Sequence, residues 1–168
     1  MAAIVLGIDP GSRVTGYGLI AVEAQRPRYL ASGCIRLGDA PLDERLRTIF
    51  ESLTELIGTH QPATVAIEQV FVGKNATSAL KLGHARGVAM LAASMASLPV
   101  AEYTPRAIKQ AVTASGSADK QQVQAMVMRL LQLPRAPASD AADALAIALC
   151  HAFTSAPLRA AKSAVAPA

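Results

Sequence analysis

Four carboxylates in this chain stand where acid groups could act together. Asp9 and Glu68 each close a short apolar run, and Asp140 and Asp143 lie three residues apart in an alanine-rich segment. Apolar runs of this kind predict buried strands, and a spacing of three puts two side chains on one face of a helix. An acid group at the mouth of a buried strand costs free energy unless a cation meets it. We therefore treat these residues as candidates for one site.

Each of these carboxylates also has an ordinary structural explanation. Asp9 precedes Pro10-Gly11-Ser12, so its side chain could cap that turn. Asp140 and Asp143 could cap the start of a helix or interact favourably with its dipole. The joint pattern favours a site, because the chain has only 12 acidic residues and four of them fall at two strand ends and one helix start.

A cavity that contains four carboxylates needs positive charge to compensate them. Like charges raise one another's pKa values and disrupt the site unless cations compensate them. Hard divalent cations take oxygen ligands, and two of them about 4 Å apart can polarise a phosphodiester, activate a water and hold the leaving oxygen. The net charge of +4 and the sequence pI near 9.4 favour a polyanionic partner without establishing one. The pattern therefore predicts a metal-dependent nuclease.

An aromatic and several basic residues are candidates for contacts with such a partner. Phe71 follows Glu68 by three residues, in a predicted loop beside the site. Its ring could stack on an unpaired base, or it could simply pack in the core. Lys74 and Lys81 lie seven residues apart, on one face of the next predicted helix.

The hydrophobic pattern predicts five strands and five helices to position these residues. Alternating or continuous apolar runs predict the strands, and apolar residues at helical spacing predict the helices. The expected strands cover residues 3–9, 14–22, 29–37, 63–68 and 99–103. The expected helices cover residues 41–58, 75–96, 105 to a break at 116, 120–133 and 140–153.

The order of these elements predicts how they pair. The first three strands form an antiparallel meander with a turn at 25–27. The first helix then delivers the fourth strand parallel to the first. Asp9 and Glu68 would then share the carboxyl edge of the sheet, where open α/β sheets place their sites. We expect one domain over residues 1–155 and a loose tail at 156–168.

Composition excludes several classes of protein. Hydrophobic residues make up 52% of the chain, which predicts a globular protein and not a disordered one. Charges and breakers interrupt every long apolar run, so no membrane span is expected. Cys34 and Cys150 lie far apart without metal-ligand spacing and are expected to be reduced thiols. With no basic leader before the first strand, we expect no signal peptide and a cytoplasmic location.

Three stretches resemble the RuvC family of Holliday junction resolvases. They are GIDPGSRVTGYG at 7–18, AIEQVFVGKNATSALKLGHARGV at 66–88 and DAADALAIA at 140–148, and the similarity runs from residue 4 to about 153. The resemblance implies an α/β, ribonuclease H-like fold with a five-stranded mixed sheet flanked by helices, which agrees with the expected strand order. It also implies a Mg²⁺-dependent endonuclease that resolves four-way DNA junctions by paired symmetric nicks in recombination and repair.

The same resemblance implies partners and ions. The expected protein is a homodimer, because a four-way junction has two-fold symmetry, and it would work beside a branch-migration helicase complex. The helix at 75–96, with Gly83 and Gly87, is the candidate dimer interface. Two Mg²⁺ ions are expected in each active site, with Mn²⁺ as a substitute.

Residue by residue, the family's positions match this sequence without departure. Its four acidic catalytic and metal-binding positions match Asp9, Glu68, Asp140 and Asp143, its junction-contacting aromatic matches Phe71, and its functional lysines match Lys109 and Lys120. Asp9 is expected to bridge both ions, and either lysine to stabilise the developing charge. Further expected DNA contacts are Arg13, Lys74 and Lys81.

Alternatives to this hypothesis remain at the level of sequence. A non-catalytic binder of nucleic-acid structure would use the carboxylates as caps and would not need Mg²⁺. An actin-like nucleotide-binding fragment would need two copies of the fold, and 168 residues hold one. A nuclease of the same type could instead cut RNA–DNA hybrids or ordinary duplex.

Overall fold

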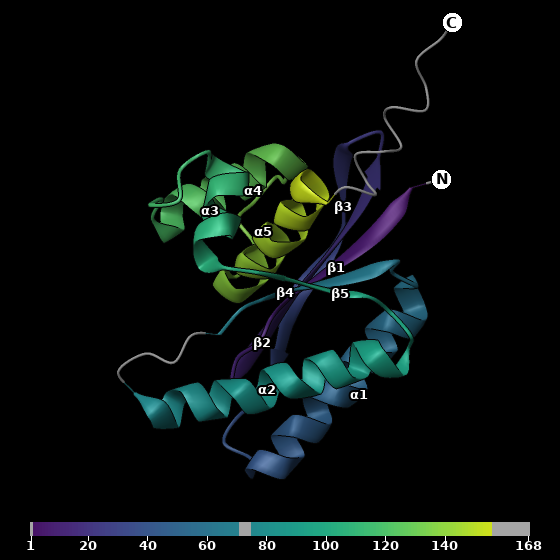
Figure 1. Cartoon of the computed structure of the whole chain (residues 1–168), viewed down its shortest axis with the longest axis vertical. Coiled ribbons are helices and arrows are strands. Elements are labelled where there is room, and N and C mark those ends of the chain that lie inside the picture. Colours follow the sequence, from purple (N-terminus) through teal and green to yellow (C-terminus); the bar gives the residue numbers. More distant parts are fainter. Residues whose placement is uncertain (1, 71–74, 156–168) are drawn as a thin grey trace, which may run out of the picture.

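The computed structural model describes residues 2–70 and 75–155, and within them the chain forms five strands and five helices (Figure 1). The strands are β1 (Ala3–Asp9), β2 (Val14–Glu23), β3 (Arg26–Arg36), β4 (Thr64–Glu68) and β5 (Val100–Tyr103). The helices are α1 (Leu42–His60), α2 (Ala76–Met95), α3 (Pro105–Thr113), α4 (Lys120–Leu131) and α5 (Ser139–Thr154).

The strands form one mixed sheet in the order β3-β2-β1-β4-β5. β1 pairs antiparallel with β2, and β2 with β3, so the first three strands are the expected meander. β4 pairs parallel with β1, and β5 parallel with β4. The central strand is fully buried at Val5, Leu6 and Ile8, because helices cover both faces of the sheet. This architecture confirms the predicted fold class.

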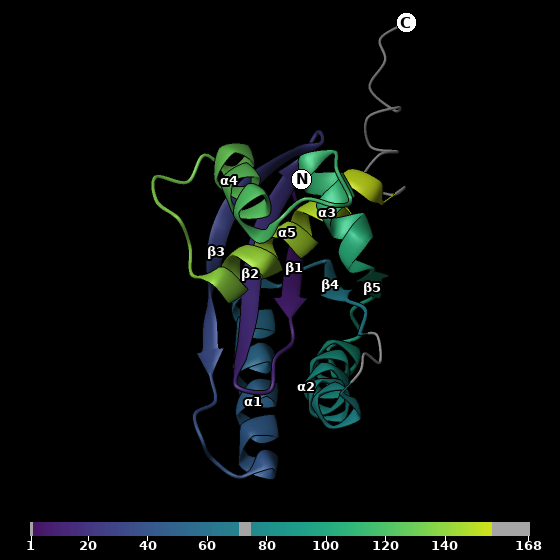
Figure 2. The ribbon, with the colours of Figure 1, turned by 90° about the vertical axis from the view of Figure 1, so that its left-hand side faces the viewer.

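The helices divide between the two faces of the sheet. Figures 1 and 2 show α3, α4 and α5 gathered on one side and α1 with α2 on the other. Each side has its own hydrophobic cluster. Helix α5 is the most deeply placed, with every residue but one from Ala141 to Ala152 buried. Its alanines let it lie close to the sheet, which matters for the site below.

Several sequence-based boundaries differ from the structure because residues adopt left-handed backbone conformations, and two examples show how. The turn expected at 25–27 lies at Ala24 and Gln25, whose φ angles are 49° and 66°. Two consecutive positive φ angles make the tight turn that suits a two-residue hairpin, so Pro27 belongs to β3, where an edge strand tolerates it. Helix α4 ends at Leu131 and not at residue 133, because Gln132 has a φ of 52°.

Some expectations concern residues that the structure does not describe. Phe71, Lys74 and the expected tail at 156–168 lie outside the described residues. Among the helices that are described, none is long and apolar enough to cross a membrane.

Candidate active site

Asp9 and Glu68 stand next to each other at one edge of the sheet. Ile8 of β1 pairs with Ile67 of β4 in parallel register, so the two carboxylates follow at the same level. Neighbouring strands lie about 4.8 Å apart. The two strands therefore deliver a pair of acid groups to their common carboxyl end.

Helix α5 reaches this edge because two glycines leave room for its backbone. A Cβ atom on Gly7 of β1 would lie 2.1 Å from the carbonyl oxygen of Ala144, and one on Gly16 of β2 would lie 2.0 Å from that of Asp140. No side chain fits into such a contact. The backbone of α5 therefore rests on the backbone of the sheet, and its first turns carry Asp140 and Asp143 beside the end of β1.

Within the described residues, hydrogen-bonded caps do not explain these carboxylates. The N-cap residue of α5 is Ala138, and no side chain caps the helix. The turn after Asp9 is held by the Thr15 hydroxyl, which donates to the Gly11 carbonyl at 3.2 Å. Of the structural explanations offered by the sequence, the dipole interaction of Asp140 in the first turn remains.

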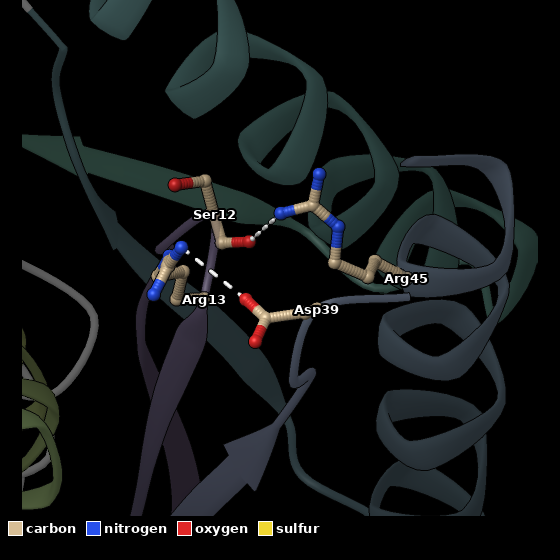
Figure 3. A network of polar contacts seen from close by, with 4 residues as sticks. All are labelled: Ser12, Arg13, Asp39 and Arg45. Atoms are coloured by element: carbon tan, nitrogen blue, oxygen red, sulfur yellow. Dashed lines mark hydrogen bonds and ion pairs between the residues drawn. The ribbon is translucent and has the colours of Figure 1, made fainter. Parts of the chain in front are cut away.

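Helix α1 holds the turn that follows Asp9 (Figure 3). The Arg45 guanidinium donates an Nη1 hydrogen bond to the Ser12 carbonyl at 2.7 Å. Arg13 forms an ion pair with Asp39 at 3.2 Å, although both side chains are largely exposed. Sequence reasoning assigned Arg45 only to a helix, because nothing in its local pattern signals a contact 33 residues away.

The electrostatics of the site centre on Asp9. Its pKa is raised to about 7, first by burial and then by the charges of Asp143, Glu68 and Asp140. Lys120 acts in the opposite direction but does not offset them. The pKa of Glu68 is also raised, mainly by burial and by Asp143. The carboxylates are therefore short of compensating positive charge.

A pocket of about 230 Å³ contains the centre of this group. Its charged lining comprises Asp9, Glu68, Asp143, Lys109 and Lys120. The Lys120 ammonium lies 2.8 Å from Asp143 Oδ2, and this contact raises the pKa of the lysine. The rest of the lining is mostly aliphatic, from α3, α4 and α5. The strand ends and three helices thus bring together carboxylates that can bind a cation and lysines that can bind an anion.

The donor set fits a hard divalent cation. All four acid groups offer oxygen, the atom that Mg²⁺, Mn²⁺ and Ca²⁺ accept. Burial, and after it the charges of the other three carboxylates, raises the pKa of Asp9, so a cation there would be favoured. Across the described ranges 2–70 and 75–155, however, no three His, Cys, Asp or Glu side chains form a ready-made ligand cluster. Asp9, Glu68 and Asp143 line the pocket, and Asp140 does not. The carboxylates do not converge on one point, as expected for like charges that repel each other.

Of the other predicted contact residues, the two that the structure describes do not line this pocket. Lys81 lies on an exposed part of α2, and Arg13 is an exposed residue of the turn after Asp9. His151 is buried near the other end of α5. Its Nδ1 lies 2.8 Å from the Tyr103 hydroxyl.

Comparisons with known proteins find relatives over most of the chain. The family model described as crossover junction endodeoxyribonuclease RuvC matches residues 5–151. A curated protein of that name from Pseudomonas paraeruginosa is 60% identical over 151 residues, which cover 90% of this chain and 87% of that protein.

Solved structures show the same relationship. The Thermus thermophilus RuvC in complex with a Holliday junction substrate is 36% identical, with a TM-score of 0.85 over 96% of each chain. The yeast mitochondrial Holliday junction resolvase shares the fold, with a TM-score of 0.65 over 95% of this chain and 83% of that one, at 12% identity.

Proposed function

Since the chain belongs to the RuvC family of crossover junction endodeoxyribonucleases, we propose that it cuts four-way DNA junctions by hydrolysing phosphodiester bonds. The observation that carries the proposal is the pocket at the ends of β1 and β4, where three carboxylates meet two lysines. Carboxylates that hold cations and amines that hold a phosphate are the two parts that such a hydrolysis needs.

We propose that Asp9, Glu68, Asp140 and Asp143 together hold two Mg²⁺ ions, with Mn²⁺ as a substitute. When bound, such ions activate the attacking water and stabilise charge in an in-line displacement at phosphorus. Asp9 would take part in holding both ions, because it ends the central strand beside Glu68 of β4 and the first turns of α5. The expected products carry 5′-phosphate and 3′-hydroxyl ends.

The two lysines of the pocket have a separate task. Lys109 and Lys120 both lower the pKa of Glu68, so their ammonium groups act inside the carboxylate cluster. An ammonium group there favours a phosphate whose negative charge grows during the reaction. Phe71, Lys74, Lys81 and Arg13 remain proposed contacts to the junction.

The dimer that would make paired nicks has a candidate surface on α2. Leu80, Leu91 and Met95 are 62%, 52% and 72% exposed. Open space surrounds Gly83 and Gly87, so another helix can approach closely there. We propose that α2 packs on a second copy, giving two active sites related by the two-fold symmetry of a junction, and that the dimer works with a branch-migration helicase complex.

The test is cleavage of a synthetic four-way junction with a mobile core, beside linear duplex of the same sequence. Paired symmetric nicks in the junction only, with Mg²⁺ or Mn²⁺ and not with chelator, are expected. Binding without nicks in either ion would instead indicate a structure-binding protein. Equal nicking of duplex would support a metal-dependent nuclease and contradict its selectivity for junctions. Light scattering of Leu91→Lys with Met95→Lys, which should yield monomers, tests the dimer.

A further inference from the structure

A second concavity lies on the other side of the first turn of α5 and has no role in the site described above. It is an open groove of about 550 Å³ between β3 and the segment 133–138, which leads from α4 to α5. Figure 2 shows this segment looping out beside β3. Gln124 of α4 donates a hydrogen bond to the Pro137 carbonyl at 3.1 Å, so the segment is tied to the helix before it. A groove of this size suits a ligand.

The groove is positively charged. Its lining includes Arg36 from β3 and Arg135 from the segment, and it includes no Asp or Glu. Both arginines are exposed, and within residues 2–70 and 75–155 neither forms an ion pair. Arg13 and Arg86, in contrast, are paired with acids. Two unpaired guanidinium groups on the two sides of an acid-free groove favour an anion, and phosphate above all.

The groove also lies close to the proposed active site, with the first turn of α5 between them. Asp9 pairs with Gly16, and Gly16 pairs with Cys34, so one row of residues crosses β1, β2 and β3. Cys34 lines the groove, and two strand spacings separate it from Asp9, which is about 10 Å. Ala141 lines the groove too, next to Asp140 in the first turn of α5. A DNA strand advances about 3.4 Å per nucleotide along its axis, so a strand held at Asp9 reaches the groove within a few nucleotides.

We propose that this groove is a backbone-phosphate subsite for the DNA strand that is cut, on one side of the cut, with Arg36 and Arg135 as its phosphate contacts. The inference rests on the proposed function and adds where the flanking strand runs. An acidic peptide would meet the same charges, but a site for a phosphodiester about two strand spacings away favours DNA. Tyr29, at 37% exposure, adds an aromatic face to the lining.

The first experiment reverses the charge of the groove. Arg36→Glu with Arg135→Glu should weaken junction binding, measured in Ca²⁺ to prevent cutting, by about 100-fold at low salt and lower the salt dependence by about two contacts. Single-turnover cutting at saturating protein should stay within about threefold, because neither arginine touches the catalytic pocket.

The matched control lies on the same strand. Arg26→Glu with Arg28→Glu changes two exposed arginines at the other end of β3, where the surface also carries Glu23. This control should bind the junction within about threefold of wild type. Thermal unfolding of both variants checks that the fold is retained.

The second experiment identifies the phosphate. Methylphosphonates replace single phosphates of the cut strand, within about three nucleotides on either side of the cut. One or two of these neutral linkages, all on the same side, should weaken binding to wild type by about tenfold and have no further effect on Arg36→Ala or Arg135→Ala. Such coupling distinguishes a direct contact from a general field.

Three outcomes overturn the subsite. The first is that the groove variant binds the junction like wild type, and the second is that the control loses as much binding as the groove variant. The third is that the alanine variants leave the phosphate effects unchanged. These results would point to an acidic protein partner or to charge alone. If wild type does not cut junctions at all, the proposed function fails instead.

Discussion

The two ends of α5 treat their polar groups in opposite ways. At its start, Asp140 and Asp143 lie with Asp9 in a cluster of like charges, and the pKa of Asp9 rises to about 7. At its end, His151 contacts the Tyr103 hydroxyl at 2.8 Å, and the Thr154 hydroxyl donates to the Cys150 carbonyl at 2.6 Å. Burial lowers the pKa of His151, so this end stays neutral. One end is electrostatically strained, and the other is satisfied.

The difference shows which end folding alone would select. The body of the helix between the two ends is apolar and buried, and it packs on the same sheet. A neutral, hydrogen-bonded end adds stability, whereas a cluster of like charges reduces it. Strain of this kind is typical of functional sites. The contrast between the two ends can be tested by mutation and by pH.

Removing a charge at the strained end should abolish cutting. Asp9→Asn and Asp143→Asn are each expected to lower junction cutting by more than about 1,000-fold, because the amide cannot replace a carboxylate ligand. Junction binding should change by less than about tenfold. Glu51→Gln, on an exposed part of α1, is the control and should cut like wild type. Wild-type rates in either variant would show that the pocket is not catalytic.

Adding one carbon between α5 and the sheet should disturb the strained end mechanically. In Gly16→Ala the new Cβ would lie 2.0 Å from the Asp140 carbonyl, and we expect a loss of about 2–4 kcal/mol in the free energy of unfolding. Cutting should also fall, since the first turn of α5 must move. Gly58→Ala in α1, where nothing lies within 4 Å, is the control and should stabilise by up to about 1 kcal/mol. Urea unfolding measures both, and equal stability of the two variants would contradict the close contact.

Charge at the strained end should lower stability as pH rises in metal-free buffer. The folded state holds the Asp9 proton up to about pH 7, whereas the unfolded chain releases it near 3.8. Stability from this group is therefore present at low pH and is lost as pH rises through 7. Asp9→Asn should remove the loss and stabilise the protein by about 1–3 kcal/mol at pH 8 in chelator. Identical pH profiles of urea unfolding for the variant and wild type would contradict the claim that the Asp9 charge destabilises the folded protein.

At the satisfied end, the same measurement should show smaller effects of the opposite sign. His151 has a lowered pKa when folded, so its contribution is present above about 6.5 and is lost as pH falls. Tyr103→Phe removes the hydroxyl that contacts His151 and should destabilise by about 1 kcal/mol. Cutting should remain within about threefold. A large loss of cutting in Tyr103→Phe with unchanged stability would mean that this end also serves the reaction.

The fold followed from local pattern to an unusual degree. Apolar runs and helical spacing predicted the elements, because each of these signals depends on neighbours in the chain. The N-cap residues Asn75 and Asp119 directly precede the helices that they start. The turn between β2 and β3 was predicted too late in the chain, at 25–27, because Pro27 is a typical turn residue. It lies at Ala24 and Gln25, although neither residue type favours a positive φ. There, pairing between β2 and β3 overrides the local preference.

By itself, the sequence determined which residues are acid, where strands and helices run, and that Asp9 and Glu68 share an edge of the sheet. These features depend on periodicity and on the short-range rules of strand connection. Only the tertiary structure decided how close α5 comes, through Gly7 and Gly16, and which groups therefore strain one another. It also decided that Arg45 holds the turn after Asp9, and that Arg36 and Arg135 face one groove. Such contacts join segments far apart in the chain, and their distances depend on packing that no local pattern encodes.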